Sequence, residues 1–324
     1  MHQGYCYNTT QQQWVQAPQK ATTDTPTQLK ILTFNVLFDA WWDKPYKVHI
    51  VRPFERFRHQ FKIMQQGDFD CIALNEVTPQ YIALLIQEPW VQESYYLSDI
   101  DGSSINSFGN LVLSKYPIHN LSFVKLPKLK RPIVCAAFSF SEHQLVLAAT
   151  HLSAKTNYAD RRQVQLKGLL EHLNEHFASS DKLILGDLNF HKEVEQVPAA
   201  YIDVWTALNP QQPGFTYDGS VNTMLREMWP LGRFWGYDDK IQMRLDRVFS
   251  QSNYWVPTQI DLCLNHPVYQ ANNRPNLIKD ILSVCFDVFG INIARNPKNY
   301  LFPSDHFGLS CIFKFQVSTT PKAS

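Results

Sequence analysis

The sequence predicts an α/β fold built in layers. The 324 residues, 44% of them apolar, can form a sizeable core. Short continuous apolar runs indicate strands that are covered on both faces. Amphipathic segments of helical period lie between several of these runs. Strands that alternate with helices are typical of layered α/β domains.

The composition sets few limits on function. The 30 basic and 29 acidic side chains balance, which neither indicates nor excludes a nucleic-acid partner. The six cysteines form no Cys-x-x-Cys pair and most lie in apolar runs, which favours reduced thiols. The N-terminus lacks an apolar signal core, and no apolar run approaches ~20 residues. We therefore expect an intracellular protein in the nucleus, the cytoplasm or both, without stable membrane insertion.

The first part of the chain is expected to pass from a tail into the core. Residues 1–28, rich in Gln, Thr and Pro, are interpreted as a flexible tail. A strand over 29–35, a helix and a short strand over 71–74 then follow. The apolar face of this helix is expected to consist of Phe54, Phe57, Phe61 and Met64.

Further strands and one helix are expected downstream. The strands cover 109–114, 145–149, 182–187, 244–249 and 308–315. An amphipathic helix spans 161–177. Residues 29–317 would form one domain followed by a C-terminal tail, 318–324. Two stretches, about 219–243 and about 265–303, are interpreted as insertions between core strands.

Several expected strands end in a carboxylate, an amide or an imidazole. These residues are Asn35, Glu76, His151, Asp187 and Asn189. Burial of an unpaired charge costs several kcal/mol, on the order of 3–5, so each charged group needs a partner or a metal ion. One such residue fits a turn or a solvated strand end. Four or more at one sheet edge indicate a polar site.

Individual motifs leave alternatives open. Asp187 and Asn189 fit either an Asx turn or an acid–amide pair that faces one reacting oxygen, because extended chain would point both side chains to one face. In Ser304-Asp305-His306, the histidine is compatible with a structural or a catalytic role. Asp246 would accept a hydrogen bond from a histidine ring or pair with a neighbouring arginine.

The candidate residues offer oxygen donors and no thiolate cluster. Such a set suits Mg²⁺ or Mn²⁺ better than a structural zinc ion. Mg²⁺ also needs few protein ligands and commonly binds substrate phosphate. Hydrolysis of a phosphate ester requires charge neutralisation and an in-line water, and this set provides for both.

Seven segments in this order resemble motifs of the endonuclease/exonuclease/phosphatase superfamily, over about residues 29–316. They are Thr33-Phe34-Asn35, Leu74-Asn75-Glu76-Val77, Gly109-Asn110-Leu111-Val112-Leu113-Ser114, Thr150-His151-Leu152, Gly186-Asp187-Leu188-Asn189, Leu245-Asp246-Arg247-Val248-Phe249 and Ser304-Asp305-His306-Phe307-Gly308-Leu309. No single segment is specific, but seven in one order are.

The resemblance implies a single catalytic domain folded as a four-layer α/β sandwich, with two mixed β-sheets packed face to face, flanked by helices, and the site at one edge. It implies Mg²⁺ or Mn²⁺ as cofactor, with the metal ligands Glu76, Asn35 and Asp305. It implies the catalytic residues Asp187, Asn189, His306, His151, Asp246 and Asn110, the last contacting the phosphate.

The resemblance also implies a role for each catalytic residue. Asp187 would position or deprotonate the attacking water, with Asn189 orienting it. His306, held by Asp246, and His151 would stabilise the phosphate oxygens. Whether Asp187 or His306 acts as general base stays open.

Other segments resemble the 5′-tyrosyl-DNA phosphodiesterase branch, which removes tyrosyl adducts from DNA 5′ ends and leaves a 5′-phosphate. They are residues 201–205, 215–218, 259–262 and 302–303. The chain departs from this branch at Asn75, where we expect Gln, at Tyr217, where we expect Trp, and at residues 153–155, where we expect Glu-Ser-Thr. These departures concern the substrate groove more than the catalytic centre.

The resemblance makes a DNA 5′ end the expected partner and DNA repair the expected process. Candidates for stacking on a base or a tyrosyl ring are Trp41, Trp42 and Tyr217, with simple packing as the alternative. Candidates for phosphate contacts are Lys155, Arg161 and Arg162, with a solvated helix face as the alternative. Other superfamily reactions stay open, on RNA ends, 2′,5′-linked oligonucleotides, abasic DNA, or phosphoinositide or sphingolipid headgroups. A lipid substrate would favour residues 229–237 as an aromatic membrane-facing loop.

Overall fold

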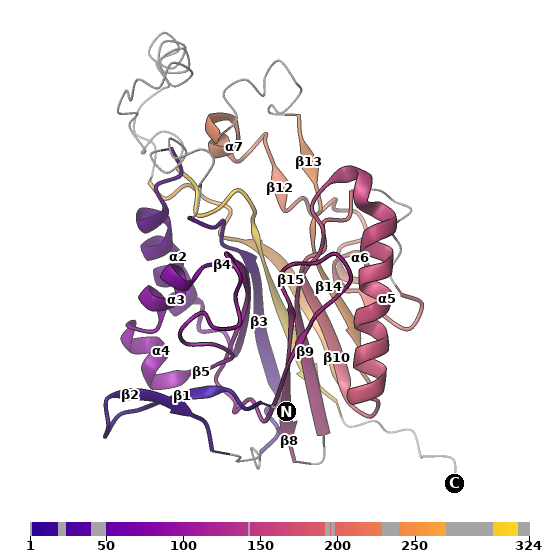
Figure 1. Ribbon diagram of the computed structural model, residues 1–324. Helices are drawn as coiled ribbons and strands as arrows, with labels where there is room; N and C mark the ends of the chain where they lie inside the picture. The colour runs from indigo at the N-terminus through magenta and orange to yellow at the C-terminus, as the bar shows by residue number, and fades with distance from the viewer. Residues whose placement is uncertain are drawn as a thin grey trace.

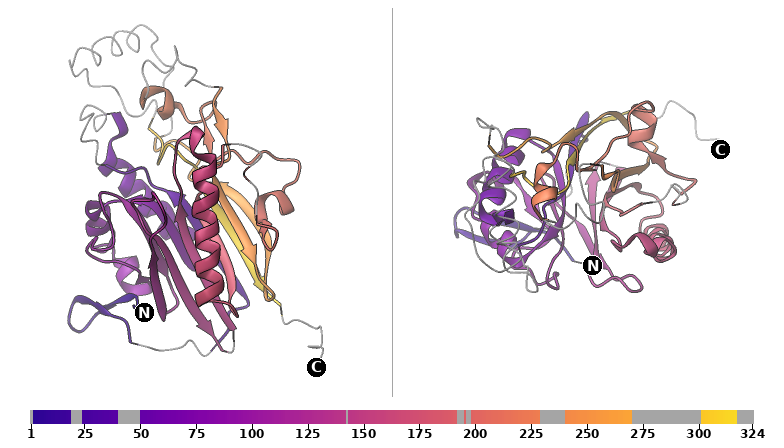
Figure 2. Two further views of the ribbon diagram at one scale, coloured as in Figure 1. Left: turned by 45° about the vertical axis from the view of Figure 1, so that its right-hand side comes forward. Right: turned by 90° about the horizontal axis from the view of Figure 1, so that it is seen from above.

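Two β-sheets lie face to face, and helices cover the outer face of each (Figure 1). This computed structural model describes residues 2–18, 24–39, 50–141, 143–191, 195, 198–228, 240–269 and 301–316. Seen from above, the helices lie on both flanks with the sheets between them (Figure 2). The four-layer sandwich expected from the sequence is confirmed.

The first sheet has eight strands and is mixed. In spatial order they are β15 (Trp255–Cys263), β16 (Gly308–Phe315), β3 (Gln28–Asn35), β4 (Cys71–Val77), β6 (Gly109–Ser114), β5 (Tyr96–Leu97), β1 (Tyr5–Asn8) and β2 (Gln13–Gln16). Strands β3 and β4 are parallel, and their other neighbours are antiparallel.

The second sheet has six strands and is also mixed. In spatial order they are β11 (Ile202–Asp203), β14 (Asp246–Gln251), β10 (Asp181–Asp187), β9 (His143–His151), β8 (Ile133–Phe140) and β7 (Asn120–Val124). Strands β9 and β10 are parallel. A separate two-stranded pair joins β12 (Tyr217–Asp218) to β13 (Gln242–Met243).

Alternate residues of the central strands belong to different apolar layers. In β3, Leu29 and Ile31 pack in the core between the two sheets. Leu32 and Phe34 face the opposite way, toward the helices on the outer side. A strand that is covered on both faces needs apolar residues at successive positions, which explains the continuous apolar runs in the sequence.

Each sheet has its own helical cover. The eight-stranded sheet packs against α2 (Pro53–Gly67), α3 (Pro79–Leu85) and α4 (Pro89–Ser94). The six-stranded sheet packs against α5 (Ala159–His176), which follows the short 3₁₀ turn Thr156–Tyr158. The remaining helices are α6 (Val204–Leu208) and α7 (Thr223–Met228).

The predicted apolar face of α2 is correct except at its first member. Phe57, Phe61 and Met64 are buried, but Phe54 is 52% exposed. It lies in the first turn of the helix, where its ring contacts the edge of Phe57. Asp68, in the left-handed conformation, ends the helix.

The prediction of a flexible tail over residues 1–28 is wrong for its first half. Strands β1 and β2 form a hairpin that extends the eight-stranded sheet beyond β5. Ala17 is buried, and the Trp14 indole donates a hydrogen bond to the Ile86 carbonyl at 3.3 Å. The strands have only four residues each, so their alternation is too short to distinguish them from a polar tail.

Some predictions concern residues outside the described ranges. These are Trp41, Trp42, the aromatic stretch 229–237, the tail 318–324 and much of both predicted insertions. The five described cysteines are free thiols, as expected, and three of them are buried. Within the described ranges, no helix has the length and apolar character required to span a membrane.

Candidate active site

Strand pairing aligns the polar strand ends in two rows, one in each sheet. In the eight-stranded sheet the register partners are Asn35, Asn75 and Asn110. In the six-stranded sheet they are His151, Asp187 and Asp246. Because the sheets lie face to face, the two rows meet at one edge of the sandwich.

Side-chain hydrogen bonds join the two rows. The Asn35 amide donates to Asp187 Oδ2 at 3.1 Å. Asn75 Oδ1 accepts from the backbone N–H of Asp187 at 3.0 Å. The Asn75 amide donates to Asn110 Oδ1 at 2.8 Å and to the Thr150 carbonyl at 3.2 Å. Asn75 therefore holds the ends of both sheets at a fixed distance.

The close contact of β10 with Asn75 and Thr150 requires glycine at position 186. Gly186 has a φ of 132°, a backbone conformation that side-chain-bearing residues rarely adopt. A Cβ atom there would lie 2.0 Å from the Thr150 carbonyl oxygen and 2.9 Å from Asn75 Oδ1. Any larger residue would displace the neighbouring strand β9 at Thr150 and the Asn75 side chain of the facing sheet.

The Asp187 carboxylate lies at the centre of the cluster. Its Oδ2 is 3.4 Å from His151 Nε2 and 3.9 Å from His306 Nε2. Burial raises the pKa of Asp187 to about 6, with a further increase from Asp246, although the nearby His306 opposes the shift. A carboxylate with this proton affinity is suited to exchange a proton near neutral pH.

His306 is held in a charged state by the acids around it. Its Nδ1 is 2.8 Å from Asp246 Oδ2. Burial alone would lower the pKa of His306, but Asp246, Asp187 and Asp305 together raise it well above its usual value. Thr216 fixes the start of β14 in turn, because its hydroxyl oxygen accepts the N–H of Asp246 at 3.0 Å.

His151 is held in the neutral state. Burial lowers its pKa well below the usual value, and the positive charges of Arg131 and His306 lower it further. Arg131 also anchors the strand end, since its Nε donates to the His151 carbonyl at 3.2 Å. The site thus combines one cationic and one neutral imidazole on either side of a carboxylate.

Glu76 reaches the cluster through an irregular strand end. Its φ of 61° falls at a register shift between β4 and β6. Oε2 accepts from the Phe38 N–H at 3.3 Å, and Oε1 is 4.0 Å from His151 Nε2. Burial and the charge of Asp305 raise the pKa of Glu76 to about 7. Burial and a neighbouring acid therefore both oppose a negative charge on Glu76 in the absence of a cation.

Two sets of groups here are candidates for a divalent cation. Among the described residues, Asp187, Asp246 and His306 offer ligand atoms within 4.8 Å of one another. Because the surrounding acids raise the pKa of His306, its ring would have to lose a proton before it could coordinate a metal. Glu76, whose pKa is raised by burial and by Asp305, offers a further carboxylate at the neighbouring corner. The Glu76 corner is therefore the second candidate cation site.

Asp305 and Asn35 lie at the same corner. Ser304 Oγ is 2.6 Å from the Asn35 carbonyl oxygen and 3.2 Å from Asp305 Oδ1. The negative charge of Asp305 raises the pKa of both Glu76 and His306. Asn35 and Glu76 lie at the ends of β3 and β4, and Asp305 lies in the loop before β16.

A buried arginine supports this corner, and the sequence analysis missed it. The Arg56 guanidinium, on α2, is fully buried and donates at 2.6–3.0 Å to four backbone carbonyls. The acceptors are Val51, Val36, Leu37 and Pro303. Arg56 therefore fixes the backbone beside Asn35 and Asp305, yet nothing in the helical pattern distinguishes it from the exposed Arg58.

Asn189 does not extend the strand as the acid–amide interpretation assumed. Its φ is 53°, and its N–H donates to Asp187 Oδ1 at 3.0 Å. Its side-chain amide donates to the Leu152 carbonyl at 3.3 Å. The Asx turn, which the sequence left as an alternative, forms here and places Asn189 beside Asp187 on a turned chain.

The predicted substrate-binding residues lie in different places around the cluster. The Tyr217 ring stands edge-on to His306, with centroids 5.2 Å apart. Lys155 lines a pocket, and the Arg161 guanidinium lies 3.7 Å from the Tyr158 ring centroid. The suggestion that Arg162 contacts phosphates is wrong, because its side chain is fully buried in an ion pair with Glu195.

The family follows from the sequence as a whole. The pattern that defines the Endonuclease/Exonuclease/phosphatase family matches residues 32–306. The chain belongs to this family. Every side chain of the cluster described above lies within the matched residues.

Individual proteins that resemble the chain include tyrosyl-DNA phosphodiesterase 2 of Bos taurus, 28% identical over 255 residues. The same enzyme of Gallus gallus is 24% identical over 257 residues. Each alignment covers 75% of this chain and 58% of the relative, so the chain matches little more than half the length of these relatives.

Solved structures share the fold. The crystal structure of D. rerio TDP2 complexed with single strand DNA product superposes with a TM-score of 0.62 at 18% identity, covering 89% of this chain and all of that one. The human Nocturnin catalytic domain superposes with a TM-score of 0.58 at 16% identity, covering 90% and 94%.

Proposed function

We propose that the protein is a divalent-metal-dependent phosphodiester hydrolase that removes tyrosyl adducts from DNA 5′ ends and leaves a 5′-phosphate. The observation that carries the proposal is the Asp187 carboxylate, which has a cationic imidazole and a neutral imidazole within 4 Å. The curated relatives that the chain matches bear the name tyrosyl-DNA phosphodiesterase 2, and one structural neighbour holds single-strand DNA product. These relatives support the choice of substrate.

The residues present fit a divalent cation. Glu76, Asn35 and Asp305 would hold it, since they offer hard oxygen donors at a corner where burial and a neighbouring acid raise the pKa of Glu76 to about 7. Mg²⁺ or Mn²⁺ bound there would supply positive charge against the phosphate oxygens. The ion would also remove the electrostatic cost of gathering these acids.

The chain's own groups supply the rest of the chemistry. Asp187 would orient the attacking water and accept its proton, as its pKa of about 6 allows. The Asn189 amide donates one hydrogen bond to the Leu152 carbonyl, and its side-chain oxygen would orient the same water. His306 would stay protonated and donate to a phosphate oxygen, where it stabilises the growing negative charge.

The remaining residues position the phosphate. Neutral His151 would donate one hydrogen bond without adding charge. Asn110, held by Asn75, would contact the same phosphate through its amide, which in this structure donates to the Pro132 carbonyl at 2.8 Å. Asp246 would keep the His306 ring oriented, because it accepts from Nδ1 and leaves Nε2 facing Asp187.

A substrate panel tests the proposal. The full chain is assayed with Mg²⁺ or with EDTA on 5′-phosphotyrosyl DNA, abasic duplex, oligoadenylate and inositol phosphates. We expect the protein to cleave 5′-phosphotyrosyl DNA, and to do so with Mg²⁺ but not with EDTA. Glu76→Gln and Asp187→Asn should each lower kcat/KM at least ~100-fold, the scale of lost metal or acid–base function.

A matched control separates these roles from a general loss of charge. Asp261, exposed on β15, gives the variant Asp261→Asn with the same chemical change outside the cluster, and its activity should equal that of the unmodified protein. Undiminished turnover by Asp187→Asn, or turnover in EDTA, would contradict the mechanism. Cleavage of another substrate alone would assign the protein to a different reaction of the family.

A further inference from the structure

A basic loop lies beside the active site and is not used by the proposed chemistry. Residues 125–132, between β7 and β8, read Lys-Leu-Pro-Lys-Leu-Lys-Arg-Pro and carry four positive charges. The whole chain has a net charge of only +1, so this is a strong local concentration. Lys125, Lys128 and Lys130 are exposed. Among the described residues, none of the three has a carboxylate within 4 Å.

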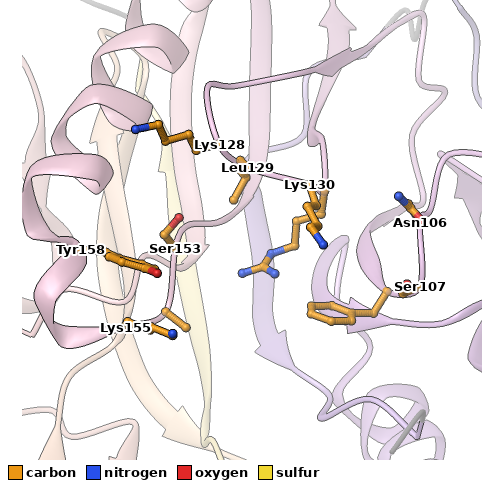
Figure 3. Close-up of a pocket in the computed structure, with 11 residues that line it drawn as sticks. Asn106, Ser107, Lys128, Leu129, Lys130, Ser153, Lys155 and Tyr158 are labelled. Atoms are coloured by element: carbon orange, nitrogen blue, oxygen red, sulfur yellow. The ribbon is translucent and has the colours of Figure 1, made fainter. Parts of the chain in front are cut away.

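This loop forms one wall of an open pocket of about 410 Å³, which we call the cationic pocket. Its lining includes Lys128, Lys130, Arg131 and Lys155 and no carboxylate. Figure 3 shows Lys155 and Tyr158 on one side of the pocket and Asn106 and Ser107 on the other. A cavity lined by charges of one sign concentrates ligands of the opposite sign.

The backbone that carries these charges is firmly held. Leu126 is buried against α5, where Gly168 leaves room for it, since a Cβ atom on that glycine would lie 3.1 Å from Leu126 Cδ2. The Gln165 amide on α5 donates to the Pro127 carbonyl at 3.1 Å and to Ser153 Oγ at 3.0 Å. The exposed lysine side chains of this loop thus extend from a backbone that is held in place.

The aromatic rings of the pocket are covered by other side chains. One face of Phe108 stacks on Phe38 at 4.9 Å between centroids, and the Arg131 guanidinium lies 5.0 Å from the ring centroid. The Tyr158 ring has Arg161 at 3.7 Å and Lys155 at 5.6 Å. These rings position cations and are not open platforms for base stacking.

The cationic pocket adjoins the catalytic cluster through Arg131. That side chain donates to the His151 and Leu152 carbonyls, and its charge acts on Glu76 and Asp187. The Phe108 and His151 rings are 6.3 Å apart between centroids. A strand whose scissile phosphate lies at Asp187 can thus continue into the pocket.

We infer that the cationic pocket binds the non-scissile backbone phosphates of a nucleic-acid strand, independently of base sequence, through Lys128, Lys130 and Lys155. The inference rests on the proposed function and adds the residues that select a polymeric substrate. None of the exposed large apolar side chains among the described residues lines the pocket, so insertion into a lipid surface has no support there.

The test measures binding without turnover. The full chain, in EDTA, is titrated against a fluorescently labelled 15-nucleotide single strand over a range of salt concentrations. Lys128→Gln/Lys130→Gln should bind about tenfold more weakly, and the slope of log affinity against log salt should fall by about 1–1.5, the value for two lost phosphate contacts. The loss should be equal for oligothymidine and for a mixed sequence.

The control removes two charges elsewhere. Lys62 on α2 and Lys314 at the far end of β16 are exposed, so Lys62→Gln/Lys314→Gln has the same net charge and should bind as tightly as the unmodified chain. Equal weakening in both double variants, or no weakening in the first, would overturn the inference. If Lys128→Gln/Lys130→Gln instead lost binding only to anionic phospholipid vesicles, or only to an acidic tyrosyl peptide, the inference would be overturned in favour of that ligand.

The binding assay stands apart from the substrate panel. If no substrate is cleaved, the proposed function fails, yet the two double variants still decide whether the pocket binds a strand. If 5′-phosphotyrosyl DNA is cleaved but the pocket variant binds single strands normally, the function stands and the pocket inference falls.

Discussion

Neutralising Glu76 should stabilise the metal-free protein, although it removes a group required for activity. In the absence of a cation, the folded state gathers Glu76, Asp187 and Asp305 at one buried corner, and the pKa of Glu76 rises from an ordinary 4.5 to about 7. The folded state therefore holds this proton more tightly than the unfolded state. The free energy of unfolding therefore falls as pH rises above 4.5, and the whole of this loss is reached above about pH 7.

The size of the effect follows from the pKa. A change from 4.5 to about 7 corresponds to a ceiling of about 3 kcal/mol, at ~1.36 kcal/mol for each tenfold change in proton affinity. The side chain is 15% exposed, and the neighbouring acids share the cost, so we expect Glu76→Gln to gain about 1–3 kcal/mol at pH 8. At pH 5 the gain should be less than about 1 kcal/mol.

Thermal unfolding measures this directly. For a chain of this length, ~1–3 kcal/mol corresponds to a rise in Tm of about 2–5 °C at pH 8 in EDTA. Addition of Mg²⁺ should raise the Tm of the unmodified protein and leave Glu76→Gln nearly unchanged, because the ion stabilises only a fold that binds it. Glu93→Gln, exposed on α4, is the matched control and should change neither value.

Two results would refute this reasoning. One is a lower Tm for Glu76→Gln in EDTA at pH 8, which would mean that the carboxylate is already compensated without a cation. The other is an equal Mg²⁺-induced rise in Tm for Glu76→Gln and the unmodified protein, which would place the ion elsewhere.

Three further predictions follow from other contacts. Asp246→Asn should lower the pKa of His306, read by imidazole NMR, and reduce kcat/KM by about 100-fold; an unchanged pKa would contradict the electrostatic role of the pair. Arg56→Met should lower the free energy of unfolding by about 3–5 kcal/mol in a urea titration, while Arg58→Met should have little effect. Deletion of residues 2–18 should lower the urea midpoint, because it exposes the edge of β5; an unchanged midpoint would show that the hairpin adds nothing to the sheet.

Much of the architecture follows from local sequence patterns. The expected strands 109–114 and 308–315 have the bounds of β6 and β16, and the expected strand 182–187 begins one residue after β10 does. These strands are covered on both faces, so their sequences are continuous apolar runs with a sharp polar end. The same sharp ends marked Asn35 and His151.

Other features depend on contacts between distant segments. Asn75 holds both sheets because the Asp187 N–H and the Thr150 carbonyl lie opposite its side chain, and register cannot be inferred from one strand. Arg56 carries no local signal, since its acceptors come from separate loops. The Asn189 turn overrode the expected alternation because the Asp187 side chain accepts its N–H.

The most direct test of the account is single-turnover cleavage of 5′-phosphotyrosyl DNA in ¹⁸O-labelled water with Mg²⁺. If the Asp187 cluster directs water at phosphorus, the 5′-phosphate product carries ¹⁸O, the tyrosine released does not, and Asp187→Asn slows the reaction at least ~100-fold. A 5′-phosphate without ¹⁸O, or labelled product formed at the normal rate by Asp187→Asn, would contradict it.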